Sequence, residues 1–232
     1  MATATPFDAN FIATLDPGKA REWSEKMEET LSEDNKRSET DIAKYRDELK
    51  AMDDAALIQT HPNARAIVDR IMQIRKNKTD EKMIVVAHKD AFLDAVAELL
   101  EREFRKNEPF RRSVGRIDKN FFKNKEPDHT ERYYLVRRLN DPADDLGIML
   151  LSALDGNWHG LHMQGASTLI LCDPIWSHAV MQRVVGTIRR LGQTRPCTIY
   201  DCGTMVETYE AAKAAREMAR MWITSDGEIL VF

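Results

Sequence analysis

The residues best suited to chemistry in this chain are two adjacent arginines, Arg189 and Arg190, followed closely by Gly192 and Gln193. A guanidinium group presents a planar fork of N–H donors that binds phosphate oxygens in pairs. The same residues also suit the last turn of a helix, because cations stabilise the negative end of the helix dipole and glycine is common just past a helix end. Phosphate binding and helix capping are therefore both open interpretations.

A polar loop between Ser152 and Met163 is the second candidate. It carries His159 and His162, which could supply two ligands to a metal ion. No third ligand stands at a useful spacing, so the sequence does not predict a metal site. The chain also lacks a Ser-His-Asp or Cys-His order that a fold of this kind would bring together.

Short apolar segments must position these residues. The runs 148–151 and 168–172 are too short and too β-branched for helices and are bounded by Gly, Asp and Pro, so they predict buried parallel strands. Asp173-Pro174 closes the second strand, and Ser177 can cap a helix with apolar residues at helical spacing. That helix ends in the basic pair.

The same alternation extends along most of the chain. Strands are predicted near residues 83, 114, 148, 169 and 197, and helices near residues 92, 133, 181 and 207. This βαβ order predicts an α/β domain of three layers, in which helices cover both faces of a mainly parallel sheet. At the end of the chain, residues 204–222 predict an Ala-rich helix and residues 228–232 a short strand.

An acidic helical extension precedes this domain. Residues 1–60 hold 8 Lys/Arg against 14 Asp/Glu, whereas the other 172 residues hold 26 against 24. An interrupted apolar stripe from Asp16-Pro17 to about Ala56 predicts two amphipathic helices with a break near Asn35. We favour the interpretation that this apolar stripe packs against the α/β domain that follows it. The alternative is that the stripe contacts a partner lobe.

Composition sets the broad class. A hydrophobic content of 43% and a charged content of 31% are typical of a globular protein. No apolar run approaches the length of about 18 residues that a membrane span needs, and the start lacks a secretion signal, so we expect an intracellular protein without a membrane partner. Cys172, Cys197 and Cys202 are expected to be buried thiols.

The order of short motifs resembles the C-terminal RecA-like lobe of superfamily two helicases, closest to the Swi/Snf-type ATPases. The resemblance is carried by Gly160-Leu161, by Asp173-Pro174 with Trp176, and by residues 190–196, RLGQTRP. Matching segments begin at His61-Pro62-Asn63, so the implied domains are the extension 1–60, the RecA-like lobe 61–203, and a C-terminal helix and short strand over 204–232.

The resemblance also implies roles for individual residues. Arg190 stands at an arginine-finger position, which acts on ATP only with a partner lobe. The implied nucleotide-binding residues are Gly160, Arg189, Arg190 and Gln193. The implied nucleic-acid-binding residues are Arg116, Lys119, Ser152 and His162.

Two departures from the family weaken this implied ATP site. The sequence contains no GxxxxGK[ST] motif, and its two DE pairs, at 47–48 and 80–81, do not end apolar strands, so the phosphate-cradling first lobe is missing. Thr187 stands where the family has its first arginine, and residues 152–163 form a longer loop in which Asp, Trp and His replace glycines. ATP and magnesium are therefore expected only where a first lobe is supplied, and otherwise no cofactor.

A basic segment between residues 111 and 125 also invites a functional interpretation. Phe121 and Phe122 lie between its cations, and such interleaving could grip a phosphate backbone and stack a base. A solvated loop with two aromatic anchors is favoured. The cations are Arg111, Arg112, Arg116, Lys119, Lys123 and Lys125.

Three hypotheses follow. The chain is half of a larger remodelling or repair ATPase, with Arg190 completing an ATP site on a first lobe in trans or missing from this chain. Alternatively, it is a stand-alone pseudo-lobe that binds nucleic acid, such as double-stranded DNA, or a protein partner without catalysis. In the third hypothesis, it is a regulatory protein that binds through its helical N-terminus. The resemblance implies the nucleus as location, with the cytoplasm otherwise.

Overall fold

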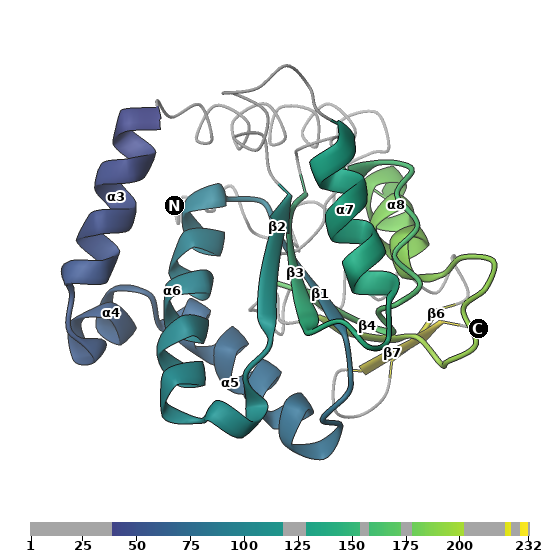
Figure 1. Cartoon of the computed structure of the whole chain (residues 1–232), viewed down its shortest axis with the longest axis horizontal. Helices are drawn as coiled ribbons and strands as arrows, with labels where there is room; N and C mark the ends of the chain where they lie inside the picture. The colour runs from purple at the N-terminus through teal and green to yellow at the C-terminus, as the bar shows by residue number, and fades with distance from the viewer. Residues whose placement is uncertain are drawn as a thin grey trace, which may run out of the picture.

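The computed structural model describes residues 39–117, 129–153, 158–172, 178–201, 221–223 and 228–231. Within these ranges a seven-stranded sheet has the order β2-β3-β1-β4-β5-β7-β6 (Figure 1). The strands are β1 (Met83–Ala87), β2 (Ser113–Ile117), β3 (Leu146–Ser152), β4 (Thr168–Leu171), β5 (Thr198–Asp201), β6 (Met221–Ile223) and β7 (Glu228–Val231). The helices are α3 (Glu39–Ala51), α4 (Asp54–Thr60), α5 (Pro62–Asn77), α6 (Asp90–Lys106), α7 (His129–Asn140) and α8 (His178–Ile188), with a short 3-10 helix, η1 (Glu108–Phe110).

The first five strands of the sheet order are parallel. Val85 at the centre of β1 lies opposite Leu150 of β3 and Ile170 of β4. Every residue of β1, β3 and β4 is buried, which is typical of parallel strands covered on both faces. The prediction of a three-layer, RecA-like α/β domain with a mainly parallel sheet is confirmed.

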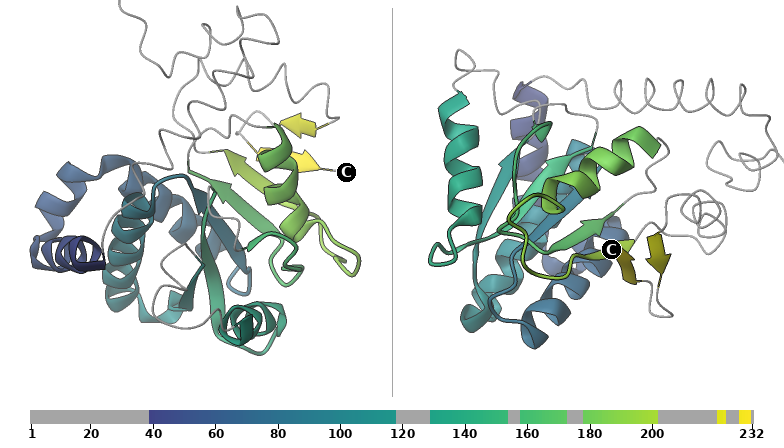
Figure 2. Two further views of the ribbon diagram at one scale, coloured as in Figure 1. Left: turned by 90° about the horizontal axis from the view of Figure 1, so that it is seen from above. Right: turned by 90° about the vertical axis from the view of Figure 1, so that its right-hand side faces the viewer.

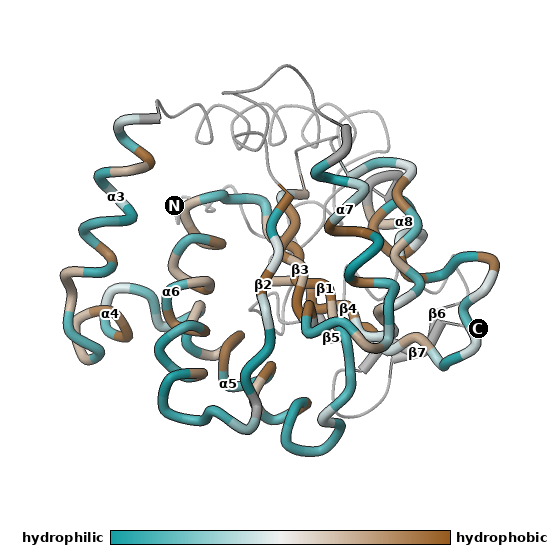
Figure 3. Tube along the Cα trace, viewed as in Figure 1, coloured by the Kyte–Doolittle hydropathy of each residue, from teal (hydrophilic) through white to brown (hydrophobic). Residues whose placement is uncertain are grey.

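Two separate cores fill the spaces between the layers. Helices α3 to α6 lie on one face of the sheet, and α7 and α8 lie on the other (Figure 2). Alternation along β1 sends Val85 to the first core and Val86 to the second. Figure 3 shows mostly brown, hydrophobic strands at the centre, and around them helices in which hydrophilic teal residues alternate with brown ones.

The described part of the extension packs on the body. Leu49 of α3 and Leu57 of α4 are fully buried in the same core as Val68 of α5. Asp53 begins α4 by accepting a hydrogen bond from the backbone N–H of Ala56 at 2.7 Å. Packing of the stripe on the body is therefore confirmed for residues 39–60. The predicted helix from Asp16 and its break near Asn35 lie outside the described residues, and the boundary at residue 61 stays a prediction.

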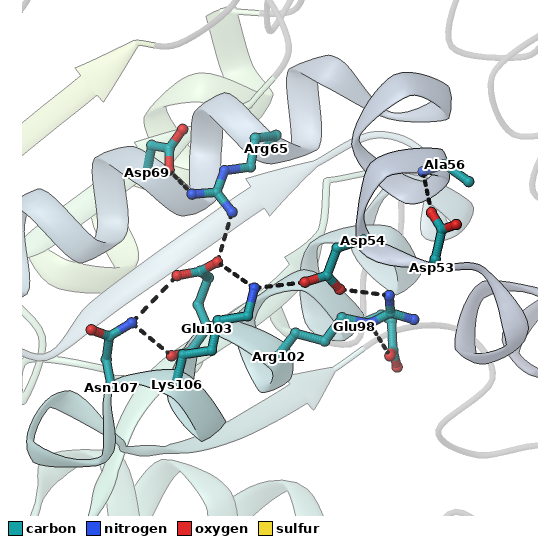
Figure 4. A network of polar contacts seen from close by, with 10 residues as sticks. All are labelled: Asp53, Asp54, Ala56, Arg65, Asp69, Glu98, Arg102, Glu103, Lys106 and Asn107. Carbon is teal, nitrogen blue, oxygen red and sulfur yellow. Dashed lines mark hydrogen bonds and ion pairs between the residues drawn. The ribbon is translucent and has the colours of Figure 1, made fainter.

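Ion pairs fasten α4 and α5 to α6 (Figure 4). Asp54 of α4 accepts hydrogen bonds from Lys106 at 2.6 Å and from Arg102 at 2.9 Å. These two hydrogen bonds lower the pKa of Asp54 below its usual value. Arg65 of α5 donates to Glu103 at 2.7 Å. The helical layer is thus held by charges at its rim as well as by its apolar core.

The C-terminal strands differ from the expected helix. Residues 221 and 222 were expected to end an Ala-rich helix, and this is wrong because β6 (Met221–Ile223) pairs antiparallel with β7. Pairing at a sheet edge outweighs local helix propensity here. Residues 202–220 and Ser177, the expected cap of α8, lie outside the described residues.

Two further findings concern membrane-spanning helices and the cysteines. No helix in the described ranges is long and apolar enough to span a membrane. Cys172 and Cys197 are buried thiols, and burial raises the pKa of the Cys197 thiol. Cys202 lies outside the described residues.

Candidate nucleotide and nucleic-acid site

Two loops meet at the end of the sheet where the parallel strands β4 and β5 begin. The backbone N–H of Met163, in the loop before β4, donates to the carbonyl oxygen of Thr187 at 2.9 Å. The side chain of Gln193, in the loop before β5, donates to the carbonyl oxygen of Ala166 at 2.9 Å. The structure therefore brings the Gly160 and Arg190 segments together, although they are far apart in the sequence.

Gln193 fastens the two loops. Its amide nitrogen also lies 3.1 Å from the carbonyl oxygen of Gln164 and 3.2 Å from that of Ile188. Its amide oxygen accepts from the backbone N–H of Arg195 at 3.1 Å. Gly192, with φ of +97°, adopts the left-handed conformation that turns the chain back after α8. Gln193 thus holds the loop that carries Arg190 against the loop before β4.

Replacing Gln193 with alanine is expected to lower the free energy of unfolding by about 1–3 kcal/mol, because it leaves carbonyl oxygens without their donor. Urea denaturation followed by circular dichroism measures this. Thr194→Ala is the matched control, since Thr194 is the exposed next residue, and it should change stability by less than about 0.5 kcal/mol. Equal stability of the two variants would show that Gln193 does not fasten the loops.

Asn140 ties the end of α7 to the first loop. Its amide nitrogen donates to the carbonyl oxygen of His162 at 2.7 Å, and its amide oxygen accepts from the backbone N–H of Gly165 at 2.7 Å. A Cβ atom at Gly165 would stand 2.2 Å from the carbonyl oxygen of Leu139, so this close approach requires glycine. The loop is therefore held firmly against α7.

Trp158, in the described part of the loop after β3, is packed into the core. Trp158 is 1% exposed, and its indole N–H donates to the carbonyl oxygen of Ser152 at 2.6 Å. Ser152 is itself buried, whereas Gly160 and His162 are exposed. His159 lies edge-on to Trp158, with the ring centroids 4.5 Å apart. Among the described residues, no group of three or more His, Cys, Asp and Glu could hold a metal ion.

The two arginines that follow α8, Arg189 and Arg190, differ in solvent exposure. Arg189 is exposed, whereas Arg190 is half-buried, and its Nε atom is buried without a hydrogen-bond partner among the described residues. The Leu191 side chain is 97% exposed at the tip of the loop. Thr187 is buried, and its hydroxyl donates to the carbonyl oxygen of Val184 at 2.6 Å. This position therefore offers a ligand neither a cation nor an available hydroxyl.

Arg116 is engaged on the other side of the sheet. Its guanidinium donates to Asp94 of α6 at 2.5 Å and to the carbonyl oxygen of Asp90 at 3.0 Å. Asp94 also accepts from Arg46 of α3 at 2.7 Å. The structure does not place Arg116 with the Gly160 and Arg190 loops, and its role in nucleic-acid binding stays a prediction. Lys119 lies outside the described residues.

A groove of about 530 Å³ runs between α7 and the loop at 160–162. Gly160 and His162 in this groove were predicted as site residues, whereas Tyr133 and Arg137 on α7 were not. The available signal was the helical face beside Val136, on which an aromatic residue and a cation stand one turn apart. The lining residues are Tyr133, Val136, Arg137, Asn140, Asp141, Gly160, Leu161 and His162.

Comparison with known proteins places these segments in a family context. No family model matches the chain. The chain is 31% identical over 144 residues to the DNA repair and recombination protein RAD54 of Saccharomyces cerevisiae, which covers 62% of this chain and 14% of that protein. It is 30% identical over 155 residues to the protein CHROMATIN REMODELING 25 of Arabidopsis thaliana, covering 65% and 15%. This chain resembles the C-terminal lobe of a Swi/Snf-type ATPase.

The matched region is a small part of these relatives. The chain spans about a seventh of the length of the curated proteins that it matches, including the DNA repair protein rhp54 of Schizosaccharomyces pombe, with 30% identity over 134 residues, 58% of this chain and 14% of that protein. Among solved structures, the C-terminal part of the Fun30 ATPase domain has a TM-score of 0.48 at 17% identity, over 72% of this chain and 48% of that chain.

The loops at 158–166 and 189–195 hold some of the residues that the family resemblance singled out, whereas Arg116 and Ser152 lie on other segments. Gly160 and Arg190 lie on loops fastened by Gln193, and Arg189 is exposed beside them. Thr187, at the first arginine position, is buried.

Proposed function

We propose that this chain acts as the second RecA-like lobe of a Swi/Snf-type, DNA-dependent ATPase and does not hydrolyse ATP alone. The observation that supports this most directly is the fastening of the Gly160 loop to the Arg190 loop through Gln193. The similarity to RAD54 over 62% of the chain supports the same assignment. ATP, magnesium and double-stranded DNA would then be bound together with a first lobe, in the nucleus.

The residues of this chain indicate which groups for ATP hydrolysis it can supply and which the first lobe must supply. Hydrolysis of this kind needs a backbone loop that cradles the phosphates, an acidic residue for magnesium and a cation that stabilises the charge on the transferred phosphoryl group. The whole sequence has no GxxxxGK[ST] motif. Arg190 can supply the cation, since its half-buried side chain follows α8 in the loop fastened by Gln193. The partner must supply everything else.

The second candidate is an inactive pseudo-lobe that binds nucleic acid or a protein. Thr187 favours it, because a buried threonine whose hydroxyl already donates to Val184 cannot contact a phosphate. A site with one arginine in place of two would stabilise a transferring phosphate less.

Reconstitution with a separate first lobe distinguishes the two candidates. We expect the chain mixed with the first lobe of S. cerevisiae RAD54 and double-stranded DNA to turn over ATP faster than that lobe alone. Arg190→Ala should reduce this gain at least a hundredfold, since arginine fingers contribute a thousandfold or more in related reactions, about 10³–10⁵. Arg111→Ala is the control and should keep the gain, because Arg111 is an exposed arginine between η1 and β2 that pairs with Glu108. DNA binding without any gain in turnover would favour the pseudo-lobe.

A further inference from the structure

The groove between α7 and the 160–162 loop has the form of a small ligand site. Its floor is apolar, since Val136 and Leu161 are 8% and 3% exposed. Its rim carries exposed Tyr133, Arg137 and His162. A volume of about 530 Å³ lies within the range of about 300–1,000 Å³ that is usual for small-molecule sites.

The walls of the groove are fixed before any ligand arrives. Asn140 uses both ends of its amide to join α7 to the loop, through the carbonyl oxygen of His162 and the N–H of Gly165. Gly160 has φ of +77° and open space where a Cβ would stand. A rigid groove loses less conformational entropy when it binds a ligand, so its contacts convert more fully into affinity.

The rim groups are available for binding. The guanidinium of Arg137 and the imidazole of His162 make no hydrogen bond or ion pair with any described residue. Tyr133 is 58% exposed, and the guanidinium carbon of Arg132 lies 5.5 Å from the centroid of its ring. Asp141, the acidic residue of the rim, already accepts a hydrogen bond from the backbone N–H of Ala143 at 2.9 Å. The rim thus combines an aromatic ring with unused cationic and polar donors.

We propose that this groove binds one nucleotide unit, with the base against Tyr133 and the apolar floor and the phosphate on Arg137 and His162. A nucleobase suits an aromatic ring beside an apolar floor, because base–aromatic stacking needs only the π-face of the base. The phosphate suits Arg137, which has no carboxylate partner among the described residues to give up. The site requires no first lobe and goes beyond the proposed ATPase role.

Fluorescence anisotropy with the full chain and a short, labelled, single-stranded oligo(dT) tests the site. We expect binding that weakens about tenfold in Tyr133→Ala, because the variant loses the aromatic ring on which the base stacks. Arg137→Ala should also weaken binding and reduce the slope of log affinity against log salt by about one. Both side chains are exposed, so thermal melting should confirm that both variants fold.

Arg111→Ala is the matched control for charge. Arg111 is an exposed arginine paired with Glu108 in a different pocket, so its removal should leave oligo(dT) binding unchanged. Arg190→Ala should also keep binding, which separates this site from the proposed ATPase role. Unchanged affinity in both Tyr133→Ala and Arg137→Ala, an equal loss in Arg111→Ala, or no binding by the wild type would overturn the proposal.

Competition identifies the source of the nucleotide. If thymidine monophosphate displaces the labelled oligonucleotide at a concentration similar to that needed with unlabelled oligo(dT), the groove is assigned to free nucleotides. If it fails to displace the oligonucleotide, the groove is assigned to a nucleic-acid strand. Displacement by polyglutamate as effective as that by unlabelled oligo(dT) would overturn the proposal, because it would show a general anion site that does not recognise a base.

Discussion

Replacing Trp158 with alanine is expected to lower the free energy of unfolding by about 3–5 kcal/mol, the range for truncation of a buried tryptophan. Trp158 is among the largest fully buried side chains and packs in the core between the sheet, α7 and α8. The change also removes the indole donor from the carbonyl oxygen of Ser152. Urea denaturation followed by far-ultraviolet circular dichroism measures the loss.

Trp158→Phe separates packing from hydrogen bonding. Phenylalanine keeps most of the buried apolar volume but leaves the Ser152 carbonyl without its donor, so the expected cost is smaller, about 1–3 kcal/mol. Because Trp158 also anchors the loop that leads to Gly160, the alanine variant should weaken oligo(dT) binding in the groove as well. A Trp158→Ala protein within 1 kcal/mol of the wild type would contradict the buried position of this side chain.

Replacing Asp94 with alanine should produce the second large effect, a loss of about 2–4 kcal/mol. Asp94 is 3% exposed at its side chain and pairs with both Arg46 and Arg116, which are 42% and 18% exposed. Removing one partner of a buried ion pair typically costs about 3–5 kcal/mol, and the exposure of Arg46 reduces that figure. Chemical denaturation measures the stability, and hydrogen exchange of α3 shows whether the helix detaches.

Glu101→Ala is the control on the same helix. Glu101 pairs with Arg105 on the surface of α6, where the two side chains are 43% and 68% exposed, so its removal should cost less than about 0.5 kcal/mol. The rate of backbone amide hydrogen exchange in α3 should rise in Asp94→Ala and stay unchanged in the control. Equal exchange of α3 in all three proteins would show that Asp94 does not hold the extension to the body.

The order of layers was predictable because it depends on local apolar patterns. The run at 168–172 and the strand predicted near residue 83 are short, apolar and bounded by turn residues, and they form β4 and β1. The helix predicted near residue 92 has a strong amphipathic face and forms α6. Parallel pairing followed from the helices between these strands.

The features that the sequence could not predict depend on tertiary contacts. Met221 and Trp222 have helical neighbours in sequence but pair with β7 in space, which a local pattern does not reveal. Arg116 is one cation among six in its segment, and only the fold shows that Asp94 holds it. Gln193 was singled out by resemblance, whereas its bracing of two loops required the positions of Gln164 and Ala166.

The central claim is that this chain is a second lobe that cannot hydrolyse ATP alone. ATPase activity of the purified chain, with and without double-stranded DNA, tests it most directly, together with DNA binding at low and moderate salt. We predict no turnover in either condition and DNA binding that weakens as salt rises. Turnover by the chain alone that survives further purification would contradict the account, because it would require a phosphate-cradling site that this sequence is not expected to form.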